Sequence, residues 1–193
     1  MTFLSTFYPN QILPLNETIW ANADENTVDW ETYATGATTN TYVAVNSASD
    51  SDWVWLHNNR VIFAEAEGSR TLRYDMQTPS GEVNPYQNVD LVVRCQRYDS
   101  AGASAPSSAT VTINLFENNS QVTGGGGTAQ QVTAANNAGA ADYTHRLSTT
   151  AINNVSNWAN VEIDASFAAS GIDTSEPEMY VTFRVYQVKI VFS

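Results

Sequence analysis

The sequence has very few cysteines and very few positive charges. Cys95 is the single cysteine, so no intrachain disulfide can form and the fold does not depend on an oxidising compartment. Seven arginines and one lysine stand against 20 acidic residues, which gives a formal net charge of −12. An acidic surface of this kind repels phosphate backbones and anionic lipid headgroups, so we expect no direct nucleic-acid partner and no membrane partner.

Long hydrophobic runs are also missing. No apolar run approaches the roughly 20 residues that a membrane-spanning helix needs. The N-terminal stretch MTFLSTFYPNQILPLNE has neither the basic start nor the continuous apolar centre of a signal peptide. These features predict a soluble protein that is made in a cytoplasm.

Motifs that would carry chemistry are absent as well. The glycine-rich stretch VTGGGG, residues 122–127, has no lysine in or after it and is not a phosphate-binding loop. His57 and His145 are the only histidines, and neither has a Cys or Glu at metal-ligand spacing beside it. There is no G-x-S-x-G nucleophile motif. We therefore expect no enzyme, with no catalytic, cofactor-binding or metal-binding residues.

Alternating hydrophobic and polar residues indicate half-buried β-strands. In the stretch VDLVVRCQ, residues 89–96, the side chains of Val89, Leu91, Val93 and Cys95 share one face. The stretch ATVTINLFE, residues 109–117, repeats the pattern. Because Cys95 lies on the inward face, we expect its thiol to be buried and inert.

Further strands are expected along the chain from residue 41 onward. The last strand, within residues 178–193, changes phase near Gln187, which predicts a β-bulge there. A single helical turn after a Ser or Thr cap is expected within residues 148–160. The other expected strands are residues 41–45, 53–57, 60–66, 70–76, 142–149 and 160–169.

Eight to ten strands with no helix long enough for a βαβ crossover predict an all-β protein. We expect an antiparallel β-sandwich, with a jelly roll as its topology. The sequence divides into an N-terminal arm or lead-in, residues 1–30, and a β-sandwich domain, residues 31–193.

The N-terminal segment carries many large apolar side chains but shows no clear helical or strand period. These side chains must be buried, either across the sheet of the same domain or on a neighbouring subunit. Under the second alternative, removal of residues 1–20 should leave a folded sandwich. The candidate subunit contacts are Phe3, Phe7, Tyr8, Ile12, Leu13 and Trp20.

The stretch DSDWVW, residues 50–55, sets two acids beside two tryptophans. A calcium loop starting at Asp50 would need Gly at its sixth position and Glu at its twelfth, where Trp55 and Val61 stand. We expect Trp53 and Trp55, which lie two residues apart on one strand face, to anchor the strand against the interior. A sugar-stacking platform and a metal site are the alternatives.

Six stretches together form a pattern of strands and turns without a catalytic signature. They are DSDWVWL, LRYDM, VDLVVRCQRYDSAG, ATVTINLFENN, YTHRLSTTAINNVSNWANVEI and MYVTFRVYQVKI. The order of these stretches resembles that of minor structural proteins of tailed bacteriophages, and the resemblance covers most of residues 24–193.

The resemblance implies a β-sandwich that decorates a phage head or sits in a tail. The expected function is that of a capsid decoration or cement protein, which binds the major capsid protein and bridges capsomers; the candidate subunit contacts named above are then candidate capsid contacts as well. It implies a homo-oligomer, with a trimer favoured, on the capsid surface of a virion assembled in the host cytoplasm. The alternative is a tail or fibre module that binds host carbohydrate.

Overall fold

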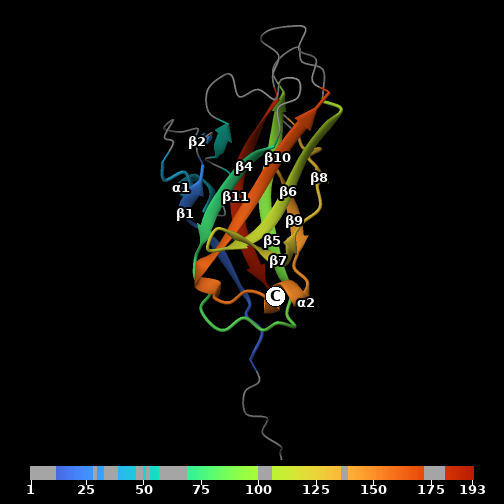
Figure 1. The fold of residues 1–193 in the computed structure, drawn as a ribbon. Helices are drawn as coiled ribbons and strands as arrows, with labels where there is room; N and C mark the ends of the chain where they lie inside the picture. Colours follow the sequence, from blue (N-terminus) through green and yellow to red (C-terminus); the bar gives the residue numbers. More distant parts are fainter. Residues whose placement is uncertain are drawn as a thin grey trace, which may run out of the picture.

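The computed structural model describes residues 12–27, 30–32, 39–46, 50, 53–56, 69–99, 106–135, 139–171 and 181–193. Its strands form a curled antiparallel sheet that folds into two layers, a β-sandwich (Figure 1). The strand predicted at residues 60–66 lies outside the described residues. The sandwich architecture expected from the sequence is confirmed, and the jelly-roll topology stays a prediction.

The first layer, called sheet A below, is built around the long C-terminal strand. Strand β11 pairs along its length with β5, and β5 pairs with β9. On its other side β11 pairs with β3 and with the first half of β1, and β3 pairs with β2. The bounds are β1 Glu17–Asn26, β2 Trp30–Thr32, β3 Val54–Leu56, β5 Val89–Asp99, β9 Ala141–Arg146 and β11 Val181–Phe192.

The second layer, called sheet B, has the order β1-β4-β10-β6-β7, with β8 also paired to β6. Strands β10 and β6 are in register over ten consecutive pairs, from Val161 opposite Glu117 to Ser170 opposite Ser108. The bounds are β4 Arg70–Met76, β6 Ser108–Glu117, β7 Ser120–Gly126, β8 Gln130–Gln131 and β10 Val161–Ser170.

Strand β1 joins the two sheets and lies inside the segment that looked irregular in the sequence. Residues 17–20 pair with β11, whereas residues 21–26 pair with β4 through two register shifts. Only Ile19 and Ala21 of this strand are buried, so the sequence alternation is too short to reveal it. A truncation through residue 20 would remove the half of β1 that belongs to sheet A, contrary to the expectation that this cut spares the sandwich.

The inward faces of both sheets form one hydrophobic core. The alternation in β5 and β6 is confirmed, and the side chain of Cys95 has no exposed surface. Aromatic rings connect the layers: Phe183 of sheet A lies 4.9 Å from Phe167 of sheet B. The ring of Phe167 lies 5.3 Å from Trp30, whose Nε1 donates a hydrogen bond to the Thr71 carbonyl at 3.0 Å.

Two local predictions are confirmed. The register between β11 and β5 shifts between Val185 and Gln187, so β11 contains the expected bulge. Helix α2, Thr149–Asn153, is the expected helical turn. Its cap is Ser148, whose Oγ accepts a hydrogen bond from the Ala151 amide at 3.1 Å.

The strand predicted at residues 41–45 is wrong, because this segment forms the short helix α1, Tyr42–Val45. The carboxylate of Asp24 on β1 accepts hydrogen bonds from the amides of Thr41 and Tyr42, each at 2.9 Å. A carboxylate at this position satisfies the free amides of the first helical turn and stabilises it. The partner lies 17 residues away in the sequence, so the local pattern did not reveal the helix.

Candidate functional site

The candidate contact residues of the N-terminal segment lie at two separate places. Phe3, Phe7 and Tyr8 lie outside the described residues. Ile12 is half-buried, and its carbonyl accepts a hydrogen bond from Asn84 Nδ2 at 2.7 Å. Leu13 is 76% exposed.

The surface around Asn84, called the lower end below, lies where the described chain begins (Figure 1). Asn84 Oδ1 accepts a hydrogen bond from the Tyr86 amide at 2.9 Å, so one side chain ties residue 86 to the backbone of Ile12. Tyr86 is 87% exposed. Two large exposed side chains, Leu13 and Tyr86, therefore flank the place where the N-terminal segment meets the fold.

Trp20 lies on β1 in sheet A rather than at the lower end. It pairs with Lys189 of β11, and the Lys189 ammonium lies 5.3 Å from the centre of the indole ring. The ring is half-buried. Trp20 therefore belongs to the outer face of sheet A.

Trp53 and Trp55 also lie on the outer face of sheet A, so the expectation that they face the interior is wrong. Between them, Val54 is fully buried and pairs with the core residue Val185. Successive strand side chains point to opposite faces, which turns both tryptophans outward. The Trp53 ring packs 5.4 Å from the ring of Tyr186.

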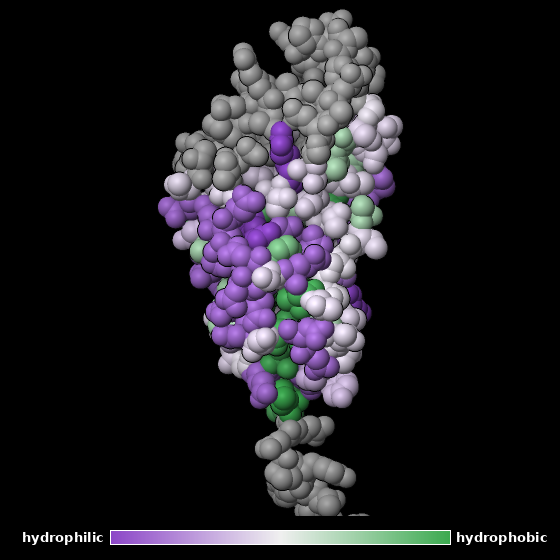
Figure 2. Space-filling model, in the orientation of Figure 1, coloured by the Kyte–Doolittle hydropathy of each residue, from purple (hydrophilic) through white to green (hydrophobic). Residues whose placement is uncertain are grey.

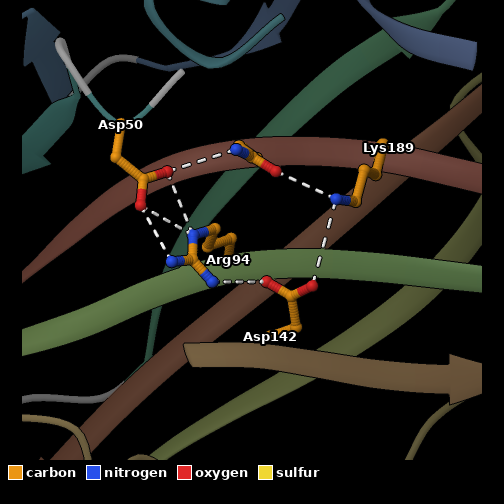
Figure 3. A pocket seen from close by; sticks show the side chains of 5 residues that line it. Asp50, Arg94, Asp142 and Lys189 are labelled. Carbon is orange, nitrogen blue, oxygen red and sulfur yellow. Dashed lines mark hydrogen bonds and ion pairs between the residues drawn. The ribbon is translucent and has the colours of Figure 1, made fainter. Parts of the chain in front are cut away.

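Beside these aromatics, five polar side chains surround a hollow of about 260 Å³ on the outer face of sheet A (Figure 3). Strand β11 contributes two of them, β5 and β9 contribute one each, and the fifth precedes β3. The bulge in β11 matters here, because it sets residues 186 and 187 together opposite Arg94. The lining residues are Asp50, Arg94, Asp142, Gln187 and Lys189.

Hydrogen bonds and ion pairs link the five side chains into a closed ring around the hollow (Figure 3). Asp50 accepts from Arg94 at 2.8 Å and from Gln187 at 3.2 Å. Arg94 reaches Asp142 at 3.1 Å, and Lys189 lies 3.9 Å from the same carboxylate. Lys189 closes the ring by donating to Gln187 Oε1 at 2.9 Å.

The ring of contacts holds the five side chains in position. The Asp50 carboxylate, hydrogen-bonded to the guanidinium, raises the pKa of Arg94 above its ordinary value. The two carboxylates and two cations balance in charge, and each group keeps donor or acceptor capacity beyond its partners in the ring. Such an arrangement can bind a polar ligand by hydrogen bonds without a net charge.

The outer face of sheet B carries a second polar cluster, which is nearly buried. Arg73 donates to Asp164 at 2.8 and 3.0 Å, and its guanidinium stacks 3.9 Å above the ring of Phe116. Glu162 accepts from the Asn119 amide at 2.7 Å. Glu162 and Asp164 are 2% and 4% exposed. Figure 2, which views this side of the molecule, shows a largely hydrophilic surface with a narrow hydrophobic strip running to the lower end.

Asp75 extends this cluster on β4, directly opposite Glu162 of β10. Burial raises the pKa of Asp75 from its ordinary value to about 6, and the nearby Glu25 and Glu162 carboxylates add to the increase. Among the residues that the structure describes, no three His, Cys, Asp or Glu side chains are placed to hold a metal ion. The cluster therefore connects neighbouring strands of sheet B, and its carboxylates outnumber the single guanidinium of Arg73, so they repel one another when all are ionised.

Burial shifts the pKa of two further reactive side chains, Cys95 and His145, within the described residues. Burial raises the pKa of the Cys95 thiol far above its ordinary value, which keeps it protonated. His145 is half-buried on β9, and burial lowers its pKa. His57 lies outside the described residues.

Comparisons with known proteins leave the family open. No model of a known protein family matches the chain, and a search of curated proteins finds no match either. Within the described part of the chain, no helix combines the length and apolar character needed to cross a membrane.

The sequence pointed to Asp50 but missed the other residues of the hollow. Alternation in residues 89–96 puts Arg94 on the face opposite Cys95, and the change of phase marks Gln187, but neither pattern shows that the two lie together. The signal available in the sequence was that polar residues of both strands occupy the outward-facing positions of the alternation. It did not show that the bulge sets Gln187 opposite Arg94, because register between strands far apart in the sequence is a tertiary property.

Proposed function

We propose that the chain is a viral structural protein, a decoration or cement protein that binds the outer surface of a phage head and bridges its capsomers. The observation that carries this proposal is the lower end, where Leu13 and Tyr86 are exposed beside the start of the described chain. The resemblance to minor structural proteins of tailed phages supports the same role.

The lower end offers a contact surface continuous with the N-terminal segment. Residues 1–11 carry Phe3, Phe7 and Tyr8, and they precede Ile12, which is followed by the exposed Leu13. Burying such side chains contributes roughly 1.5–3 kcal/mol each, which favours a protein surface as their environment. The proposed surfaces are the major capsid protein and neighbouring copies of this chain, with a trimer as the assembly that exchange of such segments would tie together.

The test compares the intact chain with a chain that starts at residue 12. Both are mixed with heads of the encoding phage that lack this protein, and binding is measured by co-sedimentation and by the temperature of head rupture. We expect the intact chain to bind and to raise the rupture temperature, and the shortened chain to bind more weakly. A double variant, Leu13→Ser with Tyr86→Ser, should weaken binding in the same direction. Failure of the intact chain to bind the heads would overturn the proposal.

A tail or fibre module that binds host carbohydrate is the second candidate. The outer face of sheet A favours it, because the half-buried rings of Trp20 and Trp53 lie on the same face as the polar hollow. Aromatic rings stack on the apolar faces of sugars while polar groups bind their hydroxyls. The isolated chain should then bind defined glycans on an array, whereas a pure cement protein should bind none.

A further inference from the structure

We infer that the hollow lined by Asp50, Arg94, Asp142, Gln187 and Lys189 is a binding site for a single neutral sugar ring. This inference rests on the second function proposed above, and it adds the place of the site and the class of sugar.

Pre-organisation is the first argument. The closed ring of contacts already holds each side chain before a ligand arrives (Figure 3). Binding then costs little side-chain entropy, which is a main term that weakens contacts made by long polar side chains. Sugar binding rests on many individually weak hydrogen bonds, so a small loss of side-chain entropy on binding matters for it.

The chemistry of the groups sets the ligand class. Carboxylate oxygens accept hydrogen bonds, whereas guanidinium, amide and ammonium groups donate them, so the lining offers both kinds of partner that a sugar hydroxyl needs. Lys189 has three N–H donors and donates one to Gln187, so it can donate to a ligand without breaking the ring of contacts.

Charge argues for a neutral ligand. Asp50 and Asp142 repel an anion, and Arg94 and Lys189 repel a cation, so a charged ligand gains from one pair what it loses to the other. A charged ligand would also lose its hydration on entering the hollow. Hydroxyl groups can donate to the carboxylates and accept from the cations at the same time.

The size of the hollow and the residues beside it fit a single sugar ring. The volume of about 260 Å³ lies below the roughly 300–1,000 Å³ of pockets for drug-sized ligands. At one side of the hollow, the Lys189 ammonium lies 5.3 Å from the centre of the half-buried Trp20 ring. The exposed part of this indole provides a platform for the apolar face of the sugar.

The test is an amide NMR titration of the intact chain with methyl glucoside, methyl galactoside and methyl mannoside. Because a lone ring makes few contacts, we expect saturation with a Kd on the order of millimolar. The shifts should centre on residues 94, 142, 187 and 189. Replacing Asp142→Ala should raise the Kd by about tenfold, the usual effect of losing a charged hydrogen-bond partner.

Two further variants make the result specific. Lys189→Gln, on a different strand, should weaken binding as Asp142→Ala does. Arg146→Ala is the matched control. Arg146 of β9 forms an ion pair with Asp90 of β5 at 2.8 Å, so it links the two strands that carry Asp142 and Arg94, but it does not line the hollow. This control should bind as the unmodified protein does.

The outcomes separate the site from the function. Glycan binding on the array that is unchanged by Asp142→Ala and Lys189→Gln would overturn the site while leaving carbohydrate binding in place. If the protein binds none of the three glycosides and no glycan on the array, both the proposed site and the carbohydrate-binding function are overturned. Binding of N-acetylneuraminic acid, an anionic sugar, as tightly as the neutral glycosides would overturn the assignment of a neutral ligand.

Discussion

Individual side chains in this sandwich behave according to the face of the strand on which they lie. Cys95 on the inner face of β5 has no exposed surface, and burial raises the pKa of its thiol. Asp75 on the outer face of β4 is close to two other acids and binds a proton more tightly than a free carboxyl does. Both effects follow from limited access to water, which disfavours the charged form.

Replacing Cys95→Ser should destabilise the protein by about 1–3 kcal/mol, because it places a hydroxyl in an apolar site. Urea unfolding of the two proteins measures the difference. The native thiol should also resist a thiol reagent until the protein unfolds. Rapid labelling of Cys95 under native conditions would contradict its burial.

Asp75 should make stability depend on pH. Its folded-state pKa is raised to about 6, so its favourable contribution is fully present below its ordinary pKa and is lost as pH rises through about 6. Between pH 5 and pH 8, the unmodified protein should therefore lose more stability than the Asp75→Asn variant, which has no carboxyl at this site.

Denaturant unfolding of both proteins at several pH values provides the measurement. Glu82→Gln is the control, since Glu82 is an exposed residue between β4 and β5 and its replacement removes the same charge. An equal stability difference between Asp75→Asn and the unmodified protein at pH 5 and pH 8 would show that Asp75 does not titrate in this range.

At the scale of the element, the β6–β7 hairpin shows how a turn positions a distant cluster. Its two-residue loop, Asn118–Asn119, has φ angles of 50° and 64°. Positive φ at both positions is typical of a type I′ turn, which asparagine tolerates. The turn directs the Asn119 amide to Glu162 and its side-chain oxygen to Arg73 at 3.2 Å.

This geometry predicts opposite effects of two substitutions at Asn118. A β-branched residue is strained in the left-handed region, so Asn118→Val should lower stability by about 1–2 kcal/mol. Asn118→Gly removes the strain and should leave stability nearly unchanged. Thermal unfolding of both variants distinguishes them, and equal melting temperatures would argue against the turn type.

On the scale of the whole molecule, the sandwich is closed along its sides by strand β1 and by side chains. β1 passes from one sheet to the other, and Gln130 Nε2 donates to the Thr144 carbonyl of β9 at 3.0 Å. Asn154 Nδ2 donates to the Thr123 carbonyl of β7 at 3.0 Å. Occupied carbonyls on these strands hinder pairing with another chain.

Truncation should locate the boundary of this unit. A chain that starts at residue 12 retains all of β1, so its circular dichroism and melting temperature should match those of the intact chain. A chain that starts at residue 21 loses Ile19, which is 3% exposed, together with four strand pairs to β11. Loss of one buried Ile side chain typically costs about 2–5 kcal/mol, so this chain should melt at a much lower temperature. Equal melting of both truncated chains would show that this half of β1 contributes little.

Much of the fold followed from local patterns. Alternation identified β5, β6, β10 and β11, and the change of phase identified the bulge. Of the candidate site, Asp50 and the tryptophans were recognised, but Trp53 and Trp55 were assigned to the wrong face. Alternation shows that two residues share a face, and it cannot distinguish the core from the outside when the strand has few other residues.

By itself the sequence determined the β-rich class, the burial of Cys95, the helical turn after Ser148 and the acidic surface. These properties depend on composition or on neighbours within a few residues. Tertiary structure alone decided the helix capped by Asp24, the passage of β1 between sheets and the ring around the hollow. Asp50 and Gln187, for example, are 137 residues apart in the chain, and only the pairing of β11 with its neighbours brings them within hydrogen-bond distance.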